Sequence, residues 1–172
     1  MESTAHSNPP RLNTDAVSSF DKSANGRNYG IVLGVLTVIY LVIINLLSDG
    51  GDPEVGFGVP MGLRFAKHLL IIPVVWIAVA TYAKSLPEGR AFKNEIGLLG
   101  RIGIWAALTV ALGNIALFAI TGNGFEQFLQ EGGTFMGVMI TSGFLIFETV
   151  VFVMIIGFVI MQAYKGKGSP ED

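Results

Sequence analysis

The chain has 172 residues, of which 51% are hydrophobic and only 14% charged, and its mean hydropathy is +0.59. This composition is too apolar for a soluble domain of this length, so we expect the folded chain to have lipid as its solvent. The absence of Cys, with only His6 and His68 as histidines, excludes disulfides, thiol chemistry and a histidine-rich metal site. The net charge of -2 comes with no basic patch for nucleic acid. We therefore expect no cofactor, no metal and no nucleic-acid partner.

Residues 1–28 are rich in Ser, Asn, Asp and Pro. Their apolar surface is too small to offset the entropy cost of ordering, which predicts a disordered cytoplasmic tail. The first apolar run ends in Ser-Asp-Gly-Gly at residues 48–51 instead of a small-residue cleavage site. It is therefore predicted to be an uncleaved signal anchor.

A hydrocarbon core of about 30 Å needs about 20 helical residues to cross it. Four charge-poor runs predict four transmembrane helices, at about residues 29–48, 63–83, 102–121 and 135–163. The second is the shortest, because only residues 68–83 are free of charge. It crosses the bilayer only if Arg64 and Lys67 snorkel toward the headgroups and the helix begins near Gly62. Pro73 is predicted to kink it.

The fourth charge-poor stretch, residues 132–164, is interrupted only by Glu148. A helix of this length is longer than the bilayer needs, so we expect it to tilt or to protrude. Unsatisfied backbone groups exclude open strands in lipid. The fold class is therefore an all-α membrane protein, a four-helix transmembrane bundle formed by residues 29–165.

The distribution of Lys and Arg predicts the orientation. Nine basic residues lie on one side of the predicted bundle: Arg11, Lys22, Arg27, Lys84, Arg90, Lys93, Arg101, Lys165 and Lys167. The other side has only Arg64 and Lys67. By the positive-inside rule, both termini are cytoplasmic, with residues 166–172 forming a second short tail.

Small and polar residues recur at helical spacing in three of the predicted spans. They are Gly30, Gly34, Thr37, Leu41 and Asn45 in the first span, Gly103, Ala107, Ala111 and Asn114 in the third, and Thr134, Thr141, Glu148 and Gln162 in the fourth. Such rows let helix backbones approach closely in lipid, so we interpret them as packing faces of the bundle. The Gly30 and Gly34 pair also fits a dimer face, although the motif is weak in a chain with 22 Gly.

A carboxylate within a span costs about 3 kcal/mol or more unless it is paired, solvated or protonated, so Glu148 requires a partner. Counted from the innermost basic residue of each span at about 1.5 Å per residue, Glu148 and Lys67 both lie at a depth of about 26 Å, Asn114 at about 20 Å and Asn45 at about 27 Å. His68 is adjacent to Lys67. We therefore predict a polar layer in which Glu148 pairs with Lys67 or His68 and accepts hydrogen bonds from Asn114 and from Asn45 as a further candidate.

Three interpretations of this layer remain open. It could be a structural ion pair that sets the register of the second and fourth spans. It could be the site of a small proton- or cation-coupled transporter that uses Glu148, with Pro73 as a hinge. Glu148 could also simply touch water. No nucleophile or phosphate loop is evident, so the chain is not expected to be an enzyme. The expected partners are the lipid bilayer and a second copy or another membrane protein.

The stretch TYAKSLPEGRAFKNEIGLLGRIGIWAAL and the outer segment GFEQFLQEGG resemble a family of four-span bacterial inner-membrane proteins of unknown function. The resemblance covers about residues 29–165. It implies a multi-pass location in the bacterial cytoplasmic membrane, and it implies no activity and no site residues.

Overall fold

The computed structural model describes residues 22–48, 62–63, 65–85, 92–122, 124 and 134–164. These residues form four α-helices, α1 (Lys22–Ser48), α3 (Ile71–Ser85), α4 (Phe92–Thr121) and α5 (Phe135–Tyr164), and the short 3-10 helix η2 (Lys67–Leu70). No strand occurs in the part of the chain that the structure describes. The predicted all-α class is confirmed.

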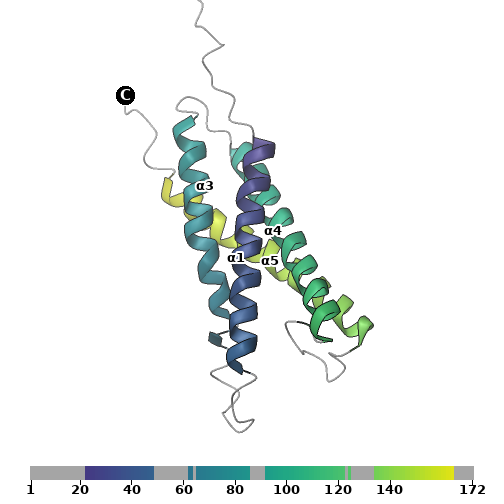
Figure 1. The fold of residues 1–172 in the computed structure, drawn as a ribbon. Helices are drawn as coiled ribbons and strands as arrows, with labels where there is room; N and C mark the ends of the chain where they lie inside the picture. The colour runs from purple at the N-terminus through teal and green to yellow at the C-terminus, as the bar shows by residue number, and fades with distance from the viewer. Residues whose placement is uncertain are drawn as a thin grey trace, which may run out of the picture.

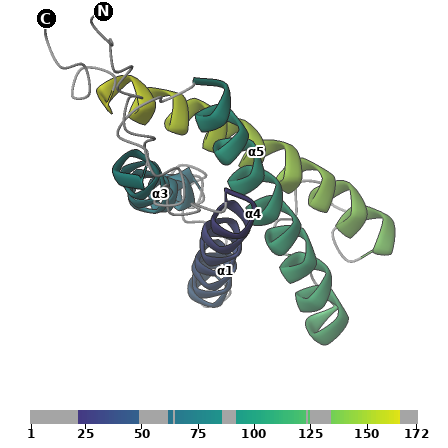
Figure 2. The same cartoon turned by 90° about the horizontal axis from the view of Figure 1, so that it is seen from above.

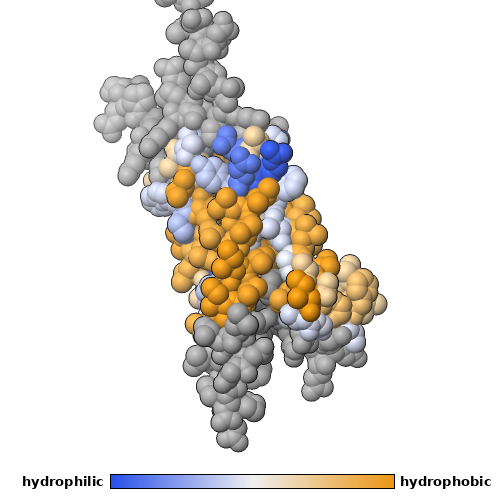
Figure 3. Space-filling view, in the orientation of Figure 1, coloured by the Kyte–Doolittle hydropathy of each residue, from blue (hydrophilic) through white to orange (hydrophobic). Residues whose placement is uncertain are grey.

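Three helices contain segments long and apolar enough to cross a membrane: Ser23–Ile44, Glu95–Thr121 and Phe135–Ala163. The remaining apolar helical segment, Lys67–Ala83, is shorter. Large apolar side chains are exposed on all the helices, and Figure 3 shows them as a broad apolar band. An apolar surface of this extent needs lipid or protein to cover it, which supports the prediction of a membrane protein.

The helices do not lie parallel. α4 packs along both α1 and α5, while α3 contacts α5 and α1. Figures 1 and 2 show α5 crossing obliquely to α1 and α3. With 30 residues, α5 is about 45 Å long. The expectation that this helix tilts in the bilayer or protrudes from it stays a prediction.

The first residues of α1 and α4 and the last residues of α3 and α5 lie at the same end of the bundle (Figure 1). The described basic side chains at this end, Arg27 and Arg101, are exposed. Figure 3 shows the hydrophilic surface gathered there, above the apolar band. This arrangement agrees with a chain that enters and leaves the bundle on one side, and the assignment of that side to the cytoplasm stays a prediction.

The predicted tail of residues 1–28 is too long, because α1 begins at Lys22. The contact with α4 explains the longer helix: Gly26 is buried, and a Cβ there would lie 2.9 Å from the Cβ of Arg101. Residues 22–28 therefore extend the packing face instead of forming coil. Residues 1–21 and 165–172 lie outside the described residues.

The glycines of α1 let it approach α4 closely. A Cβ at Gly30 would lie 2.6 Å from the Cβ of Trp105, and a Cβ at Gly34 would lie 2.5 Å from the Cβ of Thr109. The interpretation of this row as a packing face is confirmed. The dimer-face alternative for the glycine pair loses its support, because α4 already covers both residues.

The second small row, on α4, faces α5. Ala107, Ala111 and Asn114 are buried, and a Cβ at Gly103 would lie 3.5 Å from the Cα of Val150. The row on α5 is less regular, because Thr141 is buried whereas its end members, Thr134 and Gln162, are exposed. A seven-residue step drifts around an ideal helix, so such a row leaves the interface at its ends.

The second predicted span is irregular at its start. The 3-10 helix η2 immediately precedes α3, and Pro73 is the third residue of α3. Pro has no N–H to bond the carbonyl four residues before it, which is that of Leu69 in η2. A tighter 3-10 turn thus precedes the proline, and the kink itself stays a prediction.

The close α1 and α4 packing predicts that Gly34→Ala lowers the stability of the protein in detergent. The added methyl group overpacks the interface against Thr109 and the Ala106 carbonyl, at an expected cost of about 1–3 kcal/mol. Thermal unfolding followed by fluorescence-detected gel filtration measures the effect. The matched control is Gly143→Ala in α5, where a Cβ meets nothing within 4 Å. A Gly34→Ala protein as stable as this control would contradict the packing.

Candidate functional site

Two bases and one acid meet between η2 and α5. Lys67 Nζ donates a hydrogen bond to Glu148 Oε2 at 2.8 Å, and His68 Nε2 lies 3.2 Å from Glu148 Oε1. The predicted pairing of Glu148 with Lys67 or His68 is confirmed, and both bases take part. We refer to Lys67, His68 and Glu148 as the Lys-His-Glu cluster.

The cluster is placed by the turn η2. Lys67 and His68 are only 5% and 8% exposed, so both side chains of this turn point into the bundle. A 3-10 helix has three residues per turn, so successive side chains leave it in different directions. The long Lys67 side chain and the shorter His68 side chain nevertheless reach the same carboxylate. The Glu148 side chain keeps 26% of its exposure. Lys67 therefore has a partner for its ammonium group inside the bundle, and the Arg64 side chain lies outside the described residues. That this short helix crosses a bilayer stays a prediction.

His68 has further contacts that fix its ring. Nδ1 lies 2.9 Å from the Phe65 carbonyl oxygen, three residues earlier in the chain. The imidazole also stacks on Phe152 of α5, with a ring-centroid distance of 3.8 Å and an interplanar angle of 28°. Phe152 lies one helical turn after Glu148, so α5 contacts the ring at two points.

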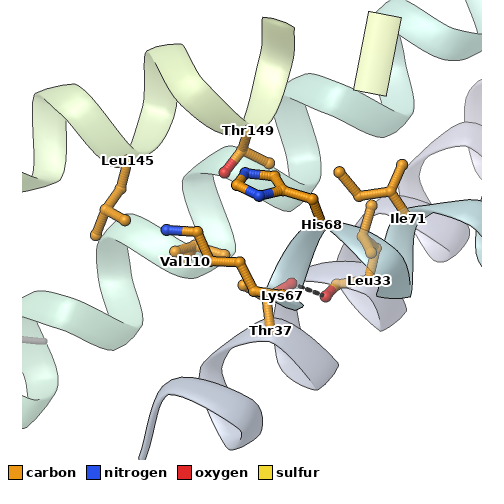
Figure 4. A pocket seen from close by; sticks show the side chains of 8 residues that line it. All are labelled: Leu33, Thr37, Lys67, His68, Ile71, Val110, Leu145 and Thr149. Carbon is orange, nitrogen blue, oxygen red and sulfur yellow. Dashed lines mark hydrogen bonds between the residues drawn. The ribbon is translucent and has the colours of Figure 1, made fainter. Parts of the chain in front are cut away.

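A small cavity lies beside Lys67 and His68 (Figure 4). Its volume is about 10 Å³, and it is lined by Leu33, Thr37, Lys67, His68, Ile71, Val110, Leu145 and Thr149. This volume is at the lower limit of what one water molecule needs. The Thr37 hydroxyl donates to the Leu33 carbonyl within α1 at 2.9 Å, so its oxygen lone pairs remain available as acceptors. The cavity can serve a water molecule, and it has no room for a larger solute.

Asn114 belongs to a different contact. Its side chain is fully buried, and Nδ2 donates to Ser142 Oγ at 3.0 Å and to the Val138 carbonyl at 3.4 Å. Ser142 lies six residues before Glu148, which is about 9 Å along α5. The prediction that Asn114 bonds Glu148 is therefore wrong. The contacts of Gly157 with Leu99 and of Gly103 with Val153 place Arg101 level with about residues 152–155 of α5, so depths counted from Arg101 and from Lys165 start at different levels.

The last predicted member of the layer, Asn45, lies near the end of α1, and its side chain is outside the described residues. The sequence pattern did not predict that Ser142 and Phe152 take part in these contacts. Phe152 could have been found, because it follows Glu148 by four residues and so shares its helix face. No comparable signal singles out Ser142 from the other small polar residues.

The cluster contains two basic groups, Lys67 and His68, and one acidic group, Glu148. Apart from Lys67 and His68, the residues that line the cavity have no titratable side chain. Across the described segments, no group of three or more His, Cys, Asp or Glu gathers around a possible metal position. The chemistry open to the cluster is charge pairing and proton binding.

Comparisons of the chain with protein families, with curated proteins and with solved structures find no match. The resemblance to four-span bacterial inner-membrane proteins therefore stays a prediction. What the chain does has to be inferred from its own geometry.

The contact between Asn114 and Ser142 predicts a measurable coupling between α4 and α5. In a double-mutant cycle of Asn114→Ala and Ser142→Ala, we expect a coupling free energy of about 0.6 kcal/mol, the average for interhelical hydrogen bonds in a membrane protein, and at most about 1.7 kcal/mol. Reversible unfolding in mixed micelles measures it. As a control, Thr109→Val should add independently to Asn114→Ala, because the Thr109 hydroxyl donates to Trp105 within its own helix. Additive effects of the Asn114 and Ser142 changes would contradict the contact.

Proposed function

We propose that the chain is an accessory or structural protein of the bacterial cytoplasmic membrane, without enzymatic activity. In this proposal the Lys-His-Glu cluster holds the short second span against α5. The observation that carries the proposal is the engagement of both carboxylate oxygens of Glu148, one by Lys67 and the other by His68. In this proposal, a carboxylate with both oxygens held in this way has a structural role first, and the binding of a transported solute comes second.

The short span has particular need of such a contact. The apolar helical segment Lys67–Ala83 is shorter than the other candidate spans, and it begins at the cluster. In lipid, apolar contacts between helices give no preference over contacts with acyl chains, so packing and polar contacts decide how a helix docks. A charge pair at the first turn of this segment therefore fixes its register against α5.

The partner of an accessory protein would use the exposed apolar surface. The glycine face of α1 is covered by α4 and is not available for a second copy. The described helices have many other exposed large apolar side chains. A homodimer or another membrane protein is the expected partner, with lipid covering the remainder of this surface.

A proton- or cation-coupled transporter is the second candidate. The observation that favours it is the meeting of three ionisable groups beside a cavity within the helical bundle. A metal cation would have to displace the Lys67 ammonium group from Glu148, whereas a proton would not. A cavity with room for one water molecule also argues for protons over larger solutes.

Proton flux into liposomes separates the two candidates. We expect liposomes that contain the purified protein and a trapped pH-sensitive dye to take up protons no faster than empty liposomes under an imposed pH gradient. An uptake that requires the protein and is lost in Glu148→Gln would favour the transporter.

Native gels in mild detergent test the accessory role. An accessory protein that is extracted directly from its native membranes should migrate as a larger complex than the same protein after purification. Equal migration would count against that role.

The structural role of the cluster predicts strong coupling between Glu148 and Lys67. Glu148→Gln removes the carboxylate that Lys67 Nζ contacts at 2.8 Å and leaves the buried ammonium group without this counter-charge, at an expected cost of about 3–5 kcal/mol. Lys67→Met leaves the carboxylate with His68 alone and is expected to cost less. The double variant should be more stable than Glu148→Gln, because it no longer buries an ammonium group that has lost the Glu148 counter-charge. Unfolding free energies in mixed micelles for the four proteins measure the coupling.

The matched control is Glu95→Gln, a carboxylate near the start of α4 and far along the bundle from the cluster. We expect this change to be additive with Lys67→Met. If the Glu148 and Lys67 changes were additive as well, the charge pair would not hold the second span.

A further inference from the structure

The contacts of His68 define where its ring protons lie. Nδ1 is 2.9 Å from the Phe65 carbonyl oxygen. A carbonyl oxygen only accepts hydrogen bonds, so Nδ1 has to carry a hydrogen in this geometry. The tautomer with hydrogen on Nε2 alone is therefore excluded.

The other ring nitrogen faces Glu148. Nε2 lies 3.2 Å from Oε1. In a neutral ring with hydrogen on Nδ1, Nε2 presents a lone pair, and a carboxylate oxygen opposite it presents another. The two atoms attract each other only when a proton lies between them, either on Nε2 or on Oε1.

We propose that His68 and Glu148 bind one exchangeable proton between them, which makes the Lys-His-Glu cluster a proton-binding site within the membrane domain. With the proton bound, the cluster has a net charge of +1, whether the proton resides on the imidazole or on the carboxyl group. Without it, the Lys67 ammonium and the Glu148 carboxylate cancel, and His68 is neutral. The released proton goes to water. The proposal rests on the charge pair described above, since Lys67 holds the second carboxylate oxygen.

The surroundings of His68 favour this assignment. The elements α1, α4 and α5 line the cavity beside the ring with residues that do not titrate, namely Leu33, Thr37, Val110, Leu145 and Thr149. Lys67 and Glu148 are thus the charged groups that face His68 among the cavity and cluster residues. Phe152 stacks on the ring, and an aromatic face favours a cation.

Proton release changes the packing of the second span. It removes the attraction between His68 and Glu148 and leaves the contact of Lys67 with Glu148 in place. The junction between η2 and α5 therefore has one contact that depends on the proton and one that does not. The cavity beside it can hold the water molecule that exchanges the proton.

The experiment uses the low histidine content of the chain. Because His6 and His68 are the only histidines, His6→Gln leaves one, and its ring nitrogens can be observed after ¹⁵N-histidine labelling. We expect the ¹⁵N shifts to show a hydrogen on Nδ1 from about pH 5 to pH 9, a range that includes the ordinary titration of histidine. Nε2 should either carry an exchangeable hydrogen or accept a hydrogen bond from a carboxylic acid.

The location of the proton is read from Glu148. If the proton resides on Oε1, the infrared spectrum should show a carboxylic-acid band that is lost in Glu148→Gln. If it resides on Nε2, Glu148→Gln should weaken proton binding about tenfold or more, because an opposite charge close by is removed. Glu95→Gln should change neither signal.

Several results would overturn the proposal: an Nδ1 without hydrogen throughout the range, an Nε2 without hydrogen together with no carboxylic-acid band, or signals that Glu148→Gln leaves unchanged. The first two need no cluster variant, so they decide the question even if Glu148→Gln does not fold. These two results do not bear on the coupling free energy between Lys67 and Glu148. Failure of the proton site is therefore distinguishable from failure of the proposed structural role.

Discussion

A carboxylate in an apolar helix is energetically costly unless an opposite charge lies close to it, and much of this structure follows from the contacts that bring such charge to Glu148. Lys67 and His68 supply it from one short turn, η2. Both side chains have to point into the bundle for this, which ties the first turn of the shortest span to the middle of α5. The charge contact thus adds to the apolar packing of α3, whose residues Val75, Val79 and Tyr82 are buried in the core. The same contact brings a histidine against a carboxylate, from which proton binding follows as a chemical consequence.

The rest of the bundle depends on close backbone packing and not on charge. Lipid tails compete with apolar side chains on equal terms, so helices in a membrane associate where small residues let their backbones approach. Gly30 and Gly34 provide this on α1, and Gly103 and Ala107 provide it on a second face of α4. α4 is therefore the central helix, with α1 on one face and α5 on the other. This part of the bundle forms a stable frame, and α3 with its charged turn docks against that frame.

A proton-dependent contact at the junction of frame and docked helix links the two proposals. The Lys67 contact maintains the register of the second span, while the His68 contact varies with proton occupancy. An accessory protein with such a junction could adjust the position of one helix without losing its fold. The small cavity beside His68 suits this role, because a single water molecule suffices to exchange a proton.

The sequence by itself determined the helical class, three of the four span positions, the need of Glu148 for a partner and the identity of both bases, because hydropathy and the cost of a buried charge are local properties of the chain. It also indicated the packing rows. It could not decide which helix each row meets, so the glycine pair of α1 remained open between α4 and a second copy. It placed Asn114 beside Glu148, whereas the tertiary structure pairs Asn114 with Ser142. Depth counted along separate helices assumes that the basic residues at their ends lie at one level, and the packing of α4 on α5 places Arg101 well inside the level of Lys165. The start of α1 at Lys22 was likewise decided by packing between helices, which no local pattern records.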